Sequence, residues 1–150
     1  MTDPAADLRR FCDLPAARLL DLFRGGTAAA PPDGPAEGLM LLLPGTKLAR
    51  PLAAAIRGLV WQGKTFDAAG GRLINRVLPF GLRAVPARIH RAASRLDGRP
   101  CLVLDYRRSS WIASPLRDEI RELAPGLWLG LVWCGRLRLG AFALRLPAAG

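Results

Sequence analysis

Residues 117–130 read RDEIRELAPGLWLG, a dense charge cluster followed by a Pro-Gly pair and an apolar, tryptophan-bearing run that continues to Trp133. Pro125-Gly126 interrupts any helix, and the residues after it favour a β-strand. The stretch therefore predicts two strands that meet at a tight turn.

The same alternation of strand-length segments and turn residues fills most of the chain. Strands are predicted near residues 39–43, 60–67, 72–78, 83–91, 100–106, 116–123, 127–134 and 137–146. Short sequential strands favour an antiparallel up-and-down barrel, because closure removes exposed sheet edges. The predicted class is mainly β (α+β), with about eight strands, and a barrel of that size has room for one small ligand.

An amphipathic helix is predicted from Asp13 to Arg24. Asp13 can cap it, Pro15 falls in its first turn, and Gly25-Gly26 ends it. We expect this helix outside the main body of the protein.

A Pro/Gly-rich linker is predicted over residues 27–38, and a second, barrel-capping helix over residues 46–58. Two units follow from this pattern. Residues 1–35 form the N-terminal helix with its linker, and residues 36–150 form the barrel domain.

The composition is that of a folded protein, with 51% hydrophobic and 23% charged residues in a chain of 150. The formal net charge of +10 is uneven, at −2 over residues 1–43 and +12 over residues 44–150. The arginines are scattered, which argues against nucleic-acid binding as the main role and favours a solvated basic face.

Cys12, Cys101 and Cys134 lack metal-ligand spacing and adjoin apolar residues, so we expect buried, unreactive thiols and no metal or other cofactor. The acidic N-terminus does not resemble a secretory signal, and no apolar run reaches the ~20 residues of a membrane span. We therefore expect a cytoplasmic protein without a transmembrane segment.

Three segments resemble conserved blocks of small, uncharacterised bacterial proteins with a lipocalin-like, or calycin, barrel. They are Trp61–Phe66 (WQGKTF), Leu102–Tyr106 (LVLDY) and Arg117–Gly130. The first is also similar to the Trp-x-Gly-Lys-x-Phe segment of GxWxG-domain proteins, although Gly58 lies three positions before the tryptophan instead of two. The resemblance implies a cavity for a retinoid, fatty-acid, isoprenoid or polyketide-like ligand.

Which side chains face this cavity depends on strand register, because a shift of one residue exchanges the two faces. The inward set of the strand 127–134 is either Leu127, Leu129, Leu131 and Trp133 or Trp128, Gly130, Val132 and Cys134. The second set leaves room beside an aromatic ring and suits a ligand chamber, although a packed core would show the same pattern.

Arg117, Glu119 and Arg121 share one face of their strand and form a self-neutralising triad. If the triad points inward, an arginine can bind a carboxylate or carbonyl head group through a bidentate contact. If it points outward, it is a surface ladder that contributes little to stability.

Other candidate ligand contacts are the polar groups of Lys64 and Tyr106 and the rings of Trp61 and Trp128. The single histidine, His90, has no sequence neighbour that completes a catalytic set, and we expect it at the surface or at the barrel mouth. No catalytic residue is assigned.

The predicted function is binding of a small hydrophobic and anionic ligand in the barrel. An alternative is a cofactor-free isomerase or cyclase in which Glu119 or Asp105 exchanges protons in the same chamber. Polyanion binding is the third class. The N-terminal helix is expected to cover the barrel mouth or to dock on a protein partner.

Overall fold

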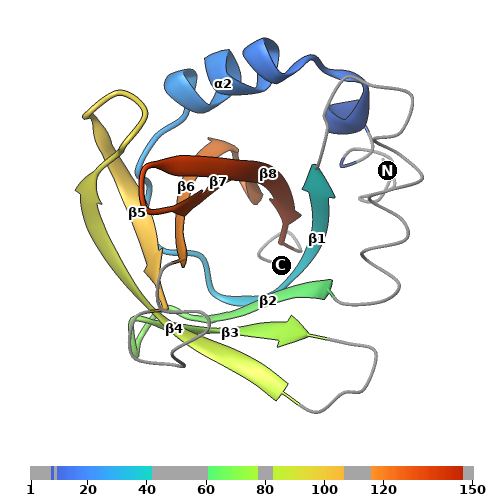
Figure 1. Ribbon diagram of the computed structural model, residues 1–150. Helices are drawn as coiled ribbons and strands as arrows, with labels where there is room; N and C mark the ends of the chain where they lie inside the picture. The colour runs from blue at the N-terminus through green and yellow to red at the C-terminus, as the bar shows by residue number, and fades with distance from the viewer. Residues whose placement is uncertain (1–7, 9, 42–60, 78–82, 107–115, 147–150) are drawn as a thin grey trace.

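The computed structural model describes residues 8, 10–41, 61–77, 83–106 and 116–146, and within them the chain forms a closed antiparallel barrel (Figure 1). Successive strands pair with each other, and the last strand pairs with the first. The strands are β1 (Gly34–Leu41), β2 (Trp61–Asp67), β3 (Arg72–Val77), β4 (Arg83–Ala93), β5 (Pro100–Asp105), β6 (Leu116–Ala124), β7 (Leu127–Cys134) and β8 (Leu137–Arg145). The predicted mainly β barrel is confirmed.

The turn residues explain why these strands form hairpins. Gly126, between β6 and β7, has φ of 78°, and Gly135, between β7 and β8, has φ of 59°. Residues with a side chain rarely adopt this left-handed conformation, so glycine at both turns sets where the strands reverse.

The start of β1 differs from the sequence prediction, which placed Gly34 to Gly38 in a linker. Residues Gly34 to Ala36 pair with β2, and Glu37 to Leu41 pair with β8. Strand propensity is low for glycine and proline, and pairing with two neighbouring strands overrides it here.

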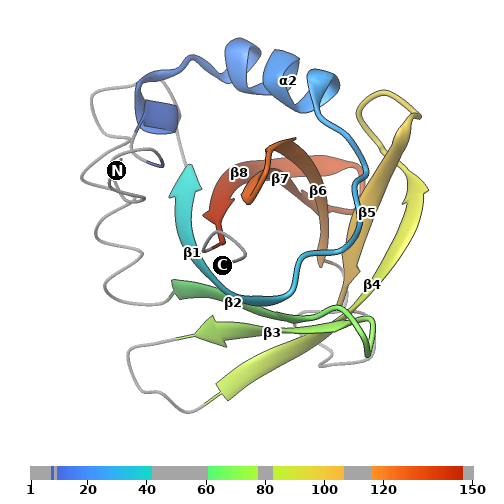
Figure 2. The same ribbon diagram turned by 180° about the vertical axis from the view of Figure 1, so that it is seen from behind.

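The predicted N-terminal helix is confirmed as α2 (Ala16–Gly25), which follows a 3-10 turn, η1 (Arg10–Asp13). Its N-cap residue is Pro15, without a side-chain hydrogen bond, so the expected Asp13 cap is wrong; Gly26 ends the helix. Figure 2 shows α2 outside the ring of strands, alongside β6, β7 and β8. The predicted helix over residues 46–58 lies outside the described residues.

The register shows which side of the sheet faces outward. Asp67, Arg72 and Arg88 lie opposite one another across β2, β3 and β4, and all three are exposed. The same row continues through Asp105 to Arg117 on β6, so these residues share the outer face.

Residues offset by one position face the interior and are buried. They form the interior core, which consists of Ala36, Phe66, Ala87, Leu102, Leu104, Tyr106, Ile120, Trp128, Phe142, Leu144 and Leu146. Because this core contains members from β1, β2 and β4 to β8, it lines the barrel on almost every side.

A second core lies between the outer face and the N-terminal segment. Leu19 and Phe23 of α2 are 2% and 0% exposed. They pack in the outer core, which also contains Leu8, Phe11, Leu39, Leu41, Cys101, Val103, Leu129, Leu131, Trp133, Ala141 and Ala143. The apolar side of α2 is therefore occupied by the barrel itself.

The connection from α2 to β1 runs past one end of the barrel. Thr27 forms a backbone bridge with Glu122 at the end of β6, and Asp33 accepts a hydrogen bond of 3.0 Å from the amide of Ala68 in the β2–β3 turn. Ala29 packs against the interior core. This segment covers the end of the barrel at which β6 finishes and β7 begins.

Candidate ligand-binding site

A tyrosine and an aspartate form a polar pair in the interior of the barrel. The hydroxyl of Tyr106 donates a hydrogen bond of 3.0 Å to the carboxylate of Asp118. The two residues are 3% and 5% exposed. Tyr106 directly follows β5, and Asp118 lies opposite Leu104 of the interior core. The pair thus lies toward the end of the barrel at which β5 finishes and β6 begins.

Burial controls the protonation of the Tyr106 hydroxyl. Desolvation raises the pKa of Tyr106 well above its usual value, and the negative charge and hydrogen bond of Asp118 raise the pKa further. The phenol therefore keeps its proton at neutral pH and acts as a donor. An oriented phenol and a carboxylate in apolar surroundings are suited to fixing the polar group of a hydrophobic molecule.

The interior beside Gly130 of β7 is filled by a side chain. The structure places Trp128 and Gly130 of β7 on the interior face, which is the second of the two sets considered from the sequence. The ring of Phe142 lies over Gly130, and a Cβ atom at position 130 would overlap it. The space expected beside Gly130 is therefore occupied by Phe142.

The triad Arg117, Glu119 and Arg121 lies on the outer face of β6, and the interior location considered for it is corrected. The outer face is nevertheless buried at this point, because α2 and the β4–β5 hairpin cover it: Glu119 and Arg121 are 0% and 1% exposed. A residue that points out of this barrel is therefore not necessarily exposed, because α2 and the β4–β5 hairpin pack on the outer face of β6.

Glu119 is surrounded by hydrogen-bond donors. Its carboxylate accepts from the Ser94 hydroxyl at 2.8 Å and the Trp133 indole at 3.0 Å. It also accepts from the backbone amide of Arg95 at 2.9 Å and from the guanidinium of Arg117 at 2.7 Å. A buried carboxylate with four donating groups is satisfied by the protein, so Glu119 serves to hold the β4–β5 hairpin on β6.

Arg121 is paired as completely as Glu119. Its guanidinium makes two hydrogen bonds to Asp97, of 2.7 and 2.8 Å, and one of 3.1 Å to the carbonyl of Phe23. The same group lies 4.5 Å from the centre of the Phe23 ring. Arg121 joins α2, the hairpin and β6, and neither it nor Arg117 reaches into the barrel as an anchor for an anionic ligand.

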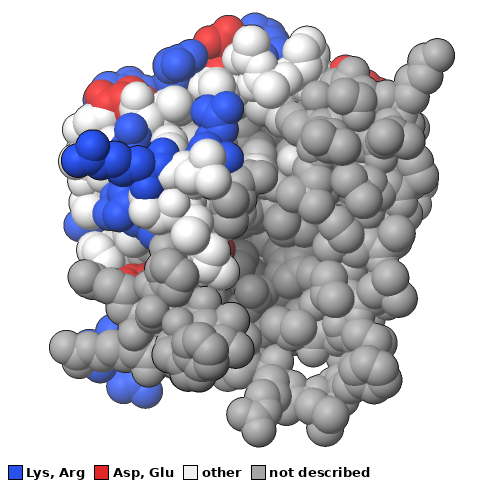
Figure 3. Space-filling view, in the orientation of Figure 1, with Lys and Arg blue, Asp and Glu red and all other residues white. Residues whose placement is uncertain are grey.

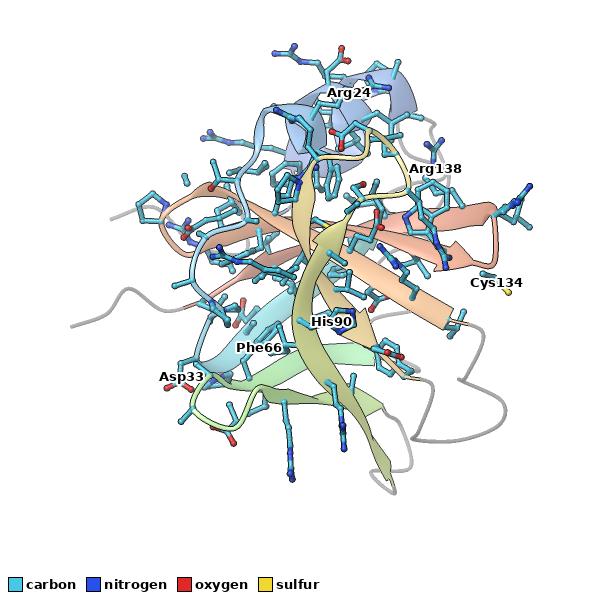
Figure 4. All side chains as sticks on the ribbon, turned by 90° about the vertical axis from the view of Figure 1, so that its left-hand side faces the viewer. Arg24, Asp33, Phe66, His90, Cys134 and Arg138 are labelled. Atoms are coloured by element: carbon cyan, nitrogen blue, oxygen red, sulfur yellow. The ribbon has the colours of Figure 1, made fainter. Side chains whose placement is uncertain are left out.

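The remaining candidates fall in different places. Trp61 and Lys64 belong to β2, and their side chains lie outside the described part of the chain. His90 is exposed on the outer face, opposite Val103, as expected (Figure 4). Burial, and to a smaller extent the charge of Glu119, raise the pKa of the Cys101 thiol to about 12, which agrees with an unreactive cysteine.

Asp118 is the interior group that the sequence analysis did not assign. The available signal was its alternation with Ile120, whose side chain is fully buried in the interior core. Alternation alone did not decide between the two faces, because the outer face of β6 carries buried residues as well.

The described residues contain no group of three or more His, Cys, Asp or Glu side chains placed to hold a metal ion. None of the helices described there is long and apolar enough to cross a membrane.

Comparisons with known proteins give the fold. No protein-family model matches the chain, and no curated protein matches it in sequence. A crystal structure of a protein from Thermomonospora curvata is similar, with a TM-score of 0.58 and 18% sequence identity. The match covers 90% of this chain and 89% of that one. At this identity the likeness shows a shared architecture and nothing about activity.

Proposed function

We propose that the protein binds a small hydrophobic molecule in its barrel, with Tyr106 and Asp118 as the polar anchors. The observation that carries the proposal is the hydrogen-bonded pair itself, which lies beside the apolar residues of the interior core. A few polar groups in an apolar site are what fixes the orientation of such ligands. The closed up-and-down topology supports placing the chain among calycin-like barrels, which the resemblance of its sequence blocks suggested.

The pair also suggests the kind of polar group on the ligand. The described interior offers a phenol donor and a carboxylate acceptor, while Arg117 and Arg121 lie outside the barrel. A ligand with a hydroxyl group fits this pair better than the anionic ligand expected from the sequence, because a hydroxyl can donate to the Asp118 carboxylate or to the Tyr106 oxygen, whose own hydrogen is given to Asp118. Isoprenoid or polyketide-like alcohols are the corresponding class.

A cofactor-free isomerase or cyclase is the second candidate, and the same geometry favours it. A phenol and a carboxylate 3.0 Å apart can pass a proton to and from a bound substrate. Asp118 takes the role that was expected for Glu119 or Asp105.

We also propose a cytoplasmic location. The free thiols of Cys101 and Cys134 are compatible with it, because the cytoplasm keeps thiols reduced.

Native mass spectrometry of the freshly purified protein tests the binding proposal. We expect a stoichiometric small molecule, released under denaturing conditions, with an apolar body and a hydroxyl group. Tyr106→Phe and Asp118→Asn should each lower its occupancy about tenfold, because each removes a hydrogen bond inside an apolar site. His90→Ala, which changes an exposed residue of the outer face, is the control and should retain the molecule.

Two results would count against the proposal. The first is protein that is empty and does not bind any apolar compound from an extract of its host. The second is a bound molecule whose occupancy is the same in Tyr106→Phe, Asp118→Asn and the control. A molecule that changes its mass or isomeric form during incubation, with the change lost in Asp118→Asn, would assign the catalytic alternative.

A further inference from the structure

We infer that the tips of two hairpins form a docking surface for an anionic phospholipid membrane. The hairpin-tip surface consists of Arg95 from the β4–β5 hairpin and Arg136, Leu137 and Arg138 from the β7–β8 hairpin. This inference concerns the outside of the barrel and is independent of the ligand proposed for the interior.

Contacts between the two hairpins bring these residues together. The β4–β5 hairpin folds over the outer face of β6, where the amide of Arg95 is bound by Glu119. From there the guanidinium of Arg95 donates to the carbonyl of Gly135 in the β7–β8 turn. Arg138 lies opposite Trp133 on the same outer face. Three exposed arginines therefore lie at the meeting point of the two hairpins.

The charges of the described surface are segregated. Every exposed acidic residue of the described chain lies between Asp13 and Asp67. From Arg72 onward the described residues that are both exposed and ionisable are arginines and His90. Figure 3 shows basic side chains gathered on the side of the molecule where Figure 1 shows the two hairpins. Near the hairpin-tip surface, Asp97 is bound to Arg121 and Glu119 is buried, so neither neutralises it.

An exposed leucine at the tip of the β7–β8 hairpin distinguishes among anionic partners. Leu137 is 66% exposed and is the one large exposed hydrophobic residue among those described. It lies between Arg136 and Arg138 in the sequence, at the start of β8. Nucleic acid would pair with the arginines and leave Leu137 in water. A bilayer interface engages both, because arginines bind lipid phosphates while an apolar side chain enters the acyl boundary.

Co-sedimentation with vesicles tests this inference on the full-length protein. We expect binding to vesicles of phosphatidylcholine and phosphatidylserine, and little binding to phosphatidylcholine alone. An arginine near an anionic bilayer is worth about fivefold in affinity, so Arg136→Ala/Arg138→Ala should weaken binding roughly 25-fold. Leu137→Ser should weaken it several-fold, and that part of the loss should persist at high salt.

A double variant with the same loss of charge provides the control. Arg72→Ala/Arg88→Ala removes two exposed arginines that face each other on β3 and β4, away from the hairpin tips, and should change binding less than about threefold. Arg136→Lys/Arg138→Lys should keep most of the affinity, because the attraction depends mainly on charge.

Three results would overturn the inference: no binding to the anionic vesicles at low salt, equal losses in the two alanine double variants, or an unchanged affinity in Leu137→Ser. Tight binding of a single-stranded RNA probe with the same dependence on Arg136 and Arg138, and without vesicle binding, would replace the membrane by nucleic acid.

Discussion

Glu119 shows that a buried charge can belong to the architecture instead of to a reaction. Its carboxylate is fully buried and receives hydrogen bonds from Ser94, Arg95, Arg117 and Trp133. Those groups come from the β4–β5 hairpin, β6 and β7, so one side chain fixes three elements. Such a residue contributes stability because its partners leave no polar group unpaired.

Replacing Glu119 tests this role. Glu119→Gln removes the charge that balances Arg117 and puts an amide donor where donors already converge, so we expect a loss of about 3 kcal/mol in the free energy of unfolding. Urea denaturation measures it. Glu37→Gln, at an exposed position of β1, should change the same quantity by less than about 0.5 kcal/mol. Unchanged stability together with loss of a bound ligand in Glu119→Gln would contradict the structural role.

At the scale of elements, the β4–β5 hairpin and α2 are attached to the barrel through β6. Asp97 of the hairpin and the Phe23 carbonyl of α2 both bind the guanidinium of Arg121. The hydrogen bonds from Arg121 hold the pKa of Asp97 well below its usual value, against the opposing effect of burial. Ionisation of Asp97 is therefore linked to the attachment of both elements.

This linkage predicts a dependence of stability on pH. The pKa of Asp97 is lower in the folded protein than in the unfolded chain. The stability that ionised Asp97 contributes is therefore complete above about pH 4 and declines as the pH falls toward the pKa of Asp97 in the folded protein. Unfolding followed between neutral pH and about pH 2 should show this decline. Asp97→Asn should lower stability at neutral pH and flatten the decline. If stability declined as steeply at low pH in Asp97→Asn as in the unchanged protein, the decline would be due to other carboxyl groups.

Element boundaries were the part of the fold that the sequence predicted well. The strand 127–134 was placed at the bounds found for β7, and the turn at Pro125-Gly126 was recognised because glycine has a conformational role there. The start of β1 was missed, since its Gly34-Pro35 sequence gains its strand pairing only from β2.

The sequence could not predict which face of β6 points into the barrel. The alternation of polar and apolar residues identifies the two faces of a strand only when one face is exposed to solvent, and β6 is covered on both faces, by the interior core and by α2. Charged residues on a doubly covered strand are therefore uninformative about direction. Asp118 pairs inside the barrel with Tyr106, which is 12 residues away in the sequence. Arg121 pairs outside the barrel with Asp97, which is 24 residues away. Local sequence patterns do not predict such contacts.

At the scale of the whole molecule, the barrel separates two kinds of chemistry. The interior holds the Tyr106–Asp118 pair beside the apolar interior core, while the outer surface carries the basic residues of the hairpins. The buried network of Glu119 and Arg121 lies between these regions and keeps the hairpin in place over β6. This division separates the proposed ligand site from the proposed membrane contact, so variants of one should leave the other unaffected.

A crystal structure of the protein as purified, with any molecule that it retains, tests the central proposal most directly. We expect electron density for an apolar molecule inside the barrel, with a polar atom within hydrogen-bonding distance of the Tyr106 hydroxyl or the Asp118 carboxylate. Density for a retained molecule against the outer face at Arg117, or a Tyr106–Asp118 pair enclosed entirely by the protein's own side chains, would contradict the proposal.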